Sequence, residues 1–263
     1  PKTPKPQVIS VQINFKIMAE DDDGVKYSFQ TENGETKTMS RGYTGKAVAS
    51  YPNGDVYDGD YVDGIREGRG TYRYGKKADT YVGEWKENLK HGIGKMTYDM
   101  TPAEKDGDEK KPEKQVGEYQ GYWENGRRHG EGVFIYPNGD IYSGWWRFGE
   151  KEGTATYKSK ATGMKMQGEW KDGEIQTGRW IYPNGVFYEG TFANNKPDGS
   201  GTWHFNNGNS LQGVYTQKPK EAGEDEAAEE EEEGGVPKKR FDLVWQADTK
   251  ISESAFKVNS VEN

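Results

Sequence analysis

Residues 119–132 read YQGYWENGRRHGEG, and this stretch decides the fold of the chain. Its first five positions alternate large, small and aromatic residues with the period of two that is typical of a β-strand. A turn follows around Gly126, and the pair Gly130 and Gly132 then leads into a second strand that returns beside the first. The stretch therefore predicts a β-hairpin in which the first, third and fifth positions share one face.

The same five-residue pattern recurs at intervals of 24, 38, 23, 24, 22 and 23 residues. The seven copies are YDGDY (57–61), YVGEW (81–85), YQGYW (119–123), YSGWW (142–146), MQGEW (166–170), YEGTF (188–192) and LQGVY (211–215). Units end on YPNG at 51–54, 136–139 and 182–185 or on FNNG at 205–208, and Asn-Gly favours the positive φ angles of a tight hairpin turn. We therefore expect an all-β fold, an elongated single-layer antiparallel β-meander with strands of about five or six residues.

The residues that define the repeat are aromatic residues and glycines. They are Tyr57, Gly59, Tyr61, Tyr81, Gly83, Trp85, Tyr119, Gly121, Trp123, Tyr142, Gly144, Trp146, Gly168, Trp170, Tyr188, Gly190 and Phe192. Glycine at the third position and at both positions of the Gly-x-Gly pair leaves bare backbone over which we expect a neighbouring ring to lie. In the fourth unit Gly153 is followed by Ala155, and the fifth unit has Gly178 between Thr177 and Arg179, so strand pairing is less certain there.

The composition excludes several classes of protein. Only 31% of the residues are hydrophobic and the mean hydropathy is -1.13, so a conventional globular core is not expected, while 13% aromatic content argues against general disorder. The chain has no cysteine, which excludes disulfides and thiolate metal sites. The net charge is -8, and residues 221–233 hold nine acidic side chains and no basic one, which leaves -8 + 9 = +1 for the rest. A near-neutral body predicts no nucleic-acid partner.

The recurring pattern Y-x-G-x-W-x-x-G-x-x-x-G-x-G resembles the MORN (membrane occupation and recognition nexus) family over residues 43–215. The resemblance implies a single-layer, elongated antiparallel sheet. Repeats followed by an acidic tail look like a radial spoke head protein of motile cilia, of the meichroacidin type.

We divide the chain into four parts. Residues 1–42 are an N-terminal extension that includes a strand expected at 11–17, Met18 as a candidate start, and a hairpin at 25–39 that could cap the sheet. The repeat sheet covers 43–217, with an insertion loop at 101–115. Residues 218–236 are an acidic linker that we expect to be disordered. Residues 237–263 form a segment that docks on the sheet or on a partner.

No catalytic, cofactor-binding or metal site is predicted. His91 and His129 occupy the same position in two units, and His204 lies on an expected strand without metal-ligand spacing to another histidine. Several G-x-G sequences occur, but they lie in expected strands with no following helix, which argues against phosphate binding. We expect a protein that is not an enzyme.

Binding is expected on the face opposite the repeated rings. The fourth positions of two consecutive units hold Tyr122 and Trp145, and Phe148 lies in the turn that follows. We expect one of two arrangements. Either this apolar cluster binds a partner, or a segment of the chain itself, the insertion or the C-terminal segment, folds over it. The C-terminal Trp245 is a fourth candidate for partner contact. The aromatic face and the open sheet edges are further options, and end-to-end pairing of edges would give a homodimer.

These features favour a scaffold subunit that joins other proteins, most similar to a radial spoke head subunit. The expected location is the cytoplasm and cytoskeleton, in the axoneme of a cilium or flagellum. The alternative is a peripheral membrane adaptor that binds acidic phospholipids. The near-neutral body, the acidic tract and the absence of a basic amphipathic helix disfavour a lipid surface.

Overall fold

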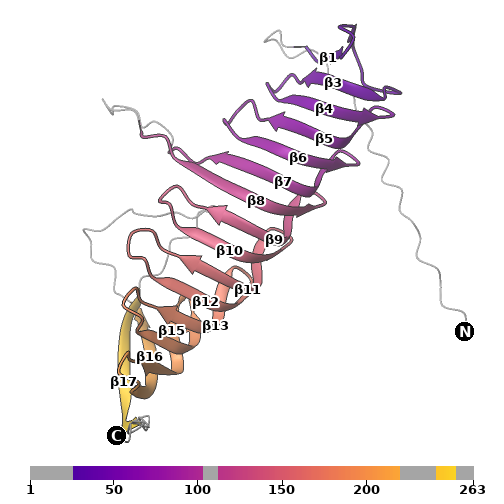
Figure 1. Cartoon of the computed structure of the whole chain (residues 1–263). Coiled ribbons are helices and arrows are strands. Elements are labelled where there is room, and N and C mark those ends of the chain that lie inside the picture. Colours follow the sequence, from indigo (N-terminus) through magenta and orange to yellow (C-terminus); the bar gives the residue numbers. More distant parts are fainter. Residues whose placement is uncertain (1–25, 103–111, 220–240, 253–263) are drawn as a thin grey trace, which may run out of the picture.

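The computed structural model describes residues 26–102, 112–219 and 241–252. Within these ranges every secondary-structure element is a β-strand, and the strands form one open antiparallel sheet (Figure 1). The expected all-β class and the meander are confirmed. Several features expected from the sequence lie outside the described residues. They are the strand at 11–17, Met18, most of the acidic linker and the middle of the insertion loop. Across the described ranges there is no helix long and apolar enough to cross a bilayer.

The strands follow one another along the chain with short turns between most of them. They are β1 (Ser28–Thr31), β2 (Thr36–Lys37), β3 (Gly45–Ser50), β4 (Val56–Val62), β5 (Ile65–Arg73), β6 (Thr80–Lys86), β7 (Leu89–Asp99), β8 (Val116–Glu124), β9 (Arg127–Ile135), β10 (Ile141–Arg147), β11 (Glu150–Lys158), β12 (Lys165–Lys171), β13 (Glu174–Ile181), β14 (Phe187–Ala193), β15 (Lys196–His204), β16 (Ser210–Pro219) and β17 (Phe241–Ser252).

Strands β4 to β16 each pair antiparallel with the strand before and the strand after, and together with β3 they form a long twisted ribbon (Figure 1). At one end β1 pairs with both β3 and the two-residue β2, with the turn at Gly34. At the other end β17 pairs with β16 from Phe241 opposite Pro219 to Ser252 opposite Ser210. The C-terminal strand thus extends the sheet at the end farthest from β1.

Most strands of the repeats are longer than expected. From β4 to β16 they span 7 to 11 residues, compared with the five or six inferred from the sequence. The ladder shifts register inside the β4–β5 hairpin between Gly59 and Tyr61, and pairing continues on both sides of this bulge. The bulge absorbs two extra residues of β5 without ending the strand, which explains the additional length.

The core is a continuous ladder of rings on one face, which we call the aromatic face. The first-position tyrosine of each complete unit is 0% exposed and contacts the fifth-position ring of its own unit and of the next unit edge-on. Tyr81, for example, lies 5.4 Å from Trp85 and 5.2 Å from Trp123 between ring centroids. Edge-to-face pairs are the favoured geometry of aromatic rings, so consecutive hairpins hold one another without an aliphatic interior.

The two glycines of each Gly-x-Gly pair have different roles, which corrects the expectation that both lie beneath a ring. A Cβ at Gly94 would come within 2.5 Å of the Tyr81 ring, so the second glycine does make room for it. The first, Gly92, has φ of +56° and forms the bulge, where its missing Cβ would meet the Glu84 side chain on the opposite face.

The two irregular units keep their strand pairing. Gly144 pairs with Ala155, whose methyl group is 4% exposed and takes the space of a second glycine. In the shorter fifth unit Gly178 itself pairs with Gly168, with φ of +153°, and so occupies the second-glycine position. Ile175 is fully buried opposite Trp170. One missing residue therefore changes the bulge and not the register of the sheet.

Candidate partner-binding surface

The face opposite the rings carries the second and fourth positions of every unit, and we call it the polar face. At each bulge the fourth-position side chain lies over the first glycine of the Gly-x-Gly pair. The pairs are Asp60 over Gly68, Glu84 over Gly92, Tyr122 over Gly130, Trp145 over Gly153 and Thr191 over Gly199. A bulge fixes the direction of the side chain opposite it, so the polar face presents one fourth-position side chain per unit at a regular spacing.

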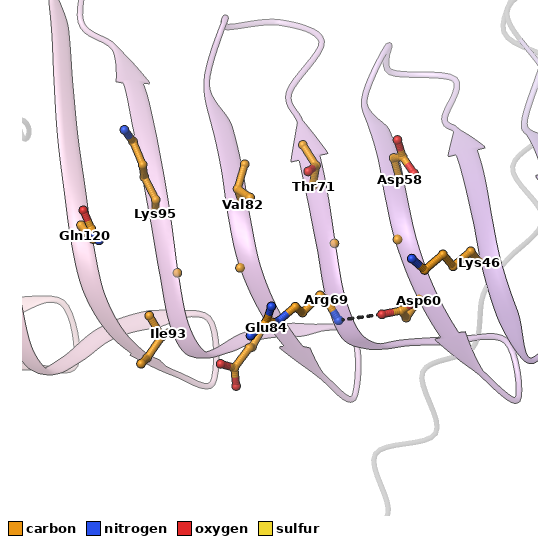
Figure 2. A pocket seen from close by; sticks show the side chains of 14 residues that line it. Lys46, Asp58, Asp60, Arg69, Thr71, Val82, Glu84, Ile93, Lys95 and Gln120 are labelled. Carbon is orange, nitrogen blue, oxygen red and sulfur yellow. Dashed lines mark hydrogen bonds between the residues drawn. The ribbon is translucent and has the colours of Figure 1, made fainter.

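Between β3 and β8 the polar face is charged (Figure 2). A shallow trough of about 570 Å³ is lined there by side chains of alternating sign, among them Lys46, Asp60, Arg69 and Glu84. The backbone N–H of Arg69 donates to Asp60 Oδ2 at 3.1 Å, and Lys95 forms an ion pair of 2.7 Å with Glu118 on the next strand. Some of the charges of this half are therefore satisfied within the chain.

Between β7 and β11 the same face becomes apolar. A second trough, of about 800 Å³, is lined by Ile93, Tyr122, Val133 and Trp145 together with small and polar residues. Ile93 is 52% exposed, Tyr122 50% and Trp145 49%, although exposing a large apolar side chain to water is unfavourable. We call these four residues the Tyr122–Trp145 patch. A group of exposed rings and aliphatic side chains on a polar surface is typical of an interaction site.

The structure adds two residues to the patch that the sequence reasoning missed. Ile93 is the middle residue of a Gly-x-Gly and pairs directly with Tyr122, and Val133 pairs with both Gln120 and Ser143. The alternation of the sequence could have identified both residues. The middle residue of each Gly-x-Gly and the residue two positions further along point to the same face as the fourth position.

The other two predicted residues lie apart from the patch. Phe148 is 55% exposed on the β10–β11 turn, where its ring lies 5.5 Å from His129. Trp245, on β17, lies on the aromatic face with its ring centroid 4.7 Å from that of Tyr215. The structure therefore brings Tyr122 and Trp145 together and places Trp245 at the end of the ribbon and on the other face.

The sequence suggested that the C-terminal segment or the insertion at 101–115 folds over the patch. The described part of the C-terminal segment lies elsewhere. β17 pairs with β16 and does not reach the patch on β7 to β10. The described ends of the insertion continue the β7–β8 hairpin, with the Met100 N–H donating to the Gln115 carbonyl at 2.9 Å, and residues 103–111 lie outside the described ranges.

The aromatic face carries its own row of charges. Four cations are each the second residue of the second strand of a unit and lie over the fifth-position ring of the following unit. They are Arg66, Lys90, Arg128 and Lys151, at 4.6, 4.5, 4.4 and 5.4 Å from the ring centroid. Burial, aided by the nearby Arg128 guanidinium, lowers the pKa of the Lys90 ammonium to about 8. Burial also raises the pKa of the first-position tyrosines, to about 12 for Tyr188. These cations join neighbouring units, so we regard this face mainly as the packing of the sheet.

The three histidines form no constellation suited to catalysis among the described residues. His129 Nε2 lies 3.3 Å from a Glu124 carboxylate oxygen, and His204 Nε2 lies 3.9 Å from Glu189 while its ring stacks on Phe187. Within the described ranges, no three side chains of His, Cys, Asp or Glu meet in a way that would hold a metal ion.

Comparison with known proteins gives a consistent result. The family model described as MORN repeat matches residues 57–77, 81–100, 119–141 and 188–210. Residues 142–187, between the last two matches, hold the two irregular units with Ala155 and Gly178.

Among curated proteins, the chain is 28% identical to alsin of Rattus norvegicus and 27% identical to alsin of Homo sapiens, each over 141 residues. It is 32% identical to MORN repeat-containing protein 3 of Xenopus laevis over 84 residues. The alsin match covers 50% of this chain but 8% of alsin, and the other covers 32% of each protein. The chain thus spans a small part of these relatives.

Proposed function

This chain is a MORN-repeat protein, and we propose that it is a non-catalytic scaffold subunit that binds other proteins through the Tyr122–Trp145 patch. MORN repeats generally serve as protein-interaction or lipid-binding modules. The observation that carries the proposal is the patch itself, where two large rings are about half exposed on a face whose other side chains are mostly polar or charged.

We further propose that the assembly it joins is the radial spoke head of a ciliary or flagellar axoneme, within the cytoskeleton. What supports this placement is the organisation of the sequence, a run of MORN units followed by an acidic tract at 221–233. In this setting the stiff ribbon would hold several spoke-head proteins at fixed distances along its length.

The test compares Trp145→Glu with Phe205→Glu in the full chain. Phe205 is 40% exposed and lies on the β15–β16 turn, far along the ribbon from the patch, so it is a matched control for adding a carboxylate at an exposed ring. We expect Trp145→Glu to lower affinity for partner proteins, measured with purified spoke-head proteins and by retention in detergent-extracted axonemes, by about tenfold or more. Wild-type affinity of the variant for every partner would exclude the patch as an interface.

The second candidate function is binding of acidic phospholipids, which the family's range of ligands keeps open. Flotation with phosphoinositide liposomes separates the two. Binding that weakens steeply with salt would favour the lipid function, and retention in extracted axonemes without flotation would favour the scaffold.

A further inference from the structure

The centre of the Tyr122–Trp145 patch holds a carboxylate. Glu131 lies on β9, between β8 with Tyr122 and β10 with Trp145, and all three line the same trough. Glu131 pairs directly with Trp145 across the ladder. On the other side Tyr122 lies against the bulge at Gly130, the residue before Glu131. An exposed acidic side chain is thus flanked by two exposed rings.

Unlike several other glutamates of the sheet, Glu131 has no side-chain partner among the described residues. Its carboxylate makes no ion pair or side-chain hydrogen bond with any described residue. By contrast, Glu118 pairs with Lys95 at 2.7 Å, Glu169 accepts a hydrogen bond from Thr154 at 2.7 Å, and Glu189 pairs with Arg179 at 3.3 Å.

The equivalent position two units earlier carries the opposite arrangement of charges. There the middle residue of the Gly-x-Gly is Arg69, which pairs across the ladder with Glu84 and lies next to Asp60 on the other side (Figure 2). A cation lies between two acidic residues at that site, whereas at Glu131 an anion lies between two aromatic residues. The second arrangement lacks a cation.

A guanidinium group has the chemistry that this arrangement would bind. It is planar, it forms charge-assisted hydrogen bonds with a carboxylate, and it stacks on aromatic rings. On its other face the chain already combines stacking and hydrogen bonding of a guanidinium, where the Arg128 guanidinium lies 4.4 Å from the Trp146 ring centroid and donates a hydrogen bond to the Gly149 carbonyl at 3.0 Å. The aliphatic part of an arginine side chain would find apolar neighbours in Ile93 and Val133.

We propose that the patch recognises a partner segment carrying an arginine between apolar residues, with the guanidinium bound to Glu131 between Tyr122 and Trp145. This inference rests on the proposed function and adds to it the chemical class of the partner. Arginine fits better than lysine because a compact ammonium group cannot contact a carboxylate bidentately while lying flat on a ring.

The experiment selects random peptides displayed on phage against the immobilised full chain. We expect the peptides that bind to carry arginine flanked by apolar residues, and we expect selection on Glu131→Arg to yield peptides with Asp or Glu instead. A synthetic peptide from the wild-type selection should bind Glu131→Gln about tenfold or more weakly, as should its arginine-to-citrulline analogue on the wild-type chain.

Glu169→Gln is the matched control, because Glu169 is an exposed carboxylate on the same face but does not line the trough. We expect it to bind the peptide like the wild type. If Glu169→Gln weakened peptide binding as much as Glu131→Gln does, the inference would be overturned, because the peptide would then be attracted by the general negative charge of the face. Binding lost in Trp145→Glu but unchanged in Glu131→Gln would overturn the inference and keep the interface. Binding unchanged in both would overturn the proposed function as well.

Discussion

The turn that joins the two strands of each unit shows how one residue can depart from its repeat. Its first left-handed position has φ near +50° in every unit and is Asp63, Glu87, Asn125, Asp172 or Asn194 in five of them. In the fourth unit it is Phe148, with φ of +51° and a ring that is 55% exposed. A bulky side chain is disfavoured in this conformation, whereas Asp and Asn tolerate it. The chain thus keeps an unfavourable residue in this turn, three positions after Trp145.

We therefore expect Phe148→Asp to raise the free energy of unfolding by about 1 kcal/mol, because it relieves the left-handed strain. Urea denaturation measures the change. The reverse substitution at the next unit, Asp172→Phe, should lower stability by a similar amount. A less stable Phe148→Asp variant would mean that the contact of the ring with His129 outweighs the strain.

Neighbouring hairpins are held together by rings and by cations that lie over them. Each first-position tyrosine contacts a ring in the next unit, and each cation of the row lies on that same ring. In the fifth and sixth units Ile175 and Pro197, both buried, replace the cation. The interface between two hairpins therefore accepts a charged or an apolar residue at this point. The charge brings a dependence on pH where the cation is a lysine.

We expect the stability contributed by Lys90 to rise with pH. Its pKa is about 8 in the folded chain and 10.5 for an unperturbed lysine, as in the unfolded chain. Between these values the unfolded chain binds more protons, so raising the pH favours folding. From pH 7.5 to 9.5 the wild type should gain about 1–2 kcal/mol relative to Lys90→Met. Arg66→Met, at the same position in the preceding unit, should show no such trend because arginine stays charged. A constant difference between wild type and Lys90→Met would contradict the prediction.

The described sheet is a one-dimensional array, because the main contacts of each strand are with its neighbours in the sheet. Its two ends differ. The short β2 covers little of β1, whereas β17 pairs along β16 and places Trp245 within 4.7 Å of Tyr215 and 6.1 Å of Tyr188 between ring centroids. β17 continues the aromatic ladder beyond the last unit, so it serves as the cap of that end.

Trp245→Ala should loosen the C-terminal end only. We expect amide hydrogen exchange in β16 and β17 to become about tenfold faster or more, with β4 to β8 unchanged, because the lost ring contacts are local. Val244→Ala removes an exposed side chain from the same strand and is the control. Unchanged exchange in Trp245→Ala, together with weaker partner binding, would instead make Trp245 an interface residue.

Much of the fold follows from local patterns in the sequence. Alternation with a period of two assigns each side chain to a face, and Asn-Gly and Gly turns place the ends of the strands, so the meander and the two faces were predictable. The same alternation pointed to Tyr122 and Trp145. It did not distinguish the two glycines of Gly-x-Gly, because a bulge arises from the fit between two strands and not from either strand alone.

The features that connect different units could be seen only in the folded sheet. Lys90 lies over Trp123, and β17 joins β16 across a segment with no repeat pattern. The grouping of Glu131 with Tyr122 and Trp145 likewise depends on register shifts of two residues at two neighbouring bulges. The repeat sets which residues share a face, because that depends on alternation along one strand. Which of them meet depends on how neighbouring strands align, and only packing fixes that alignment.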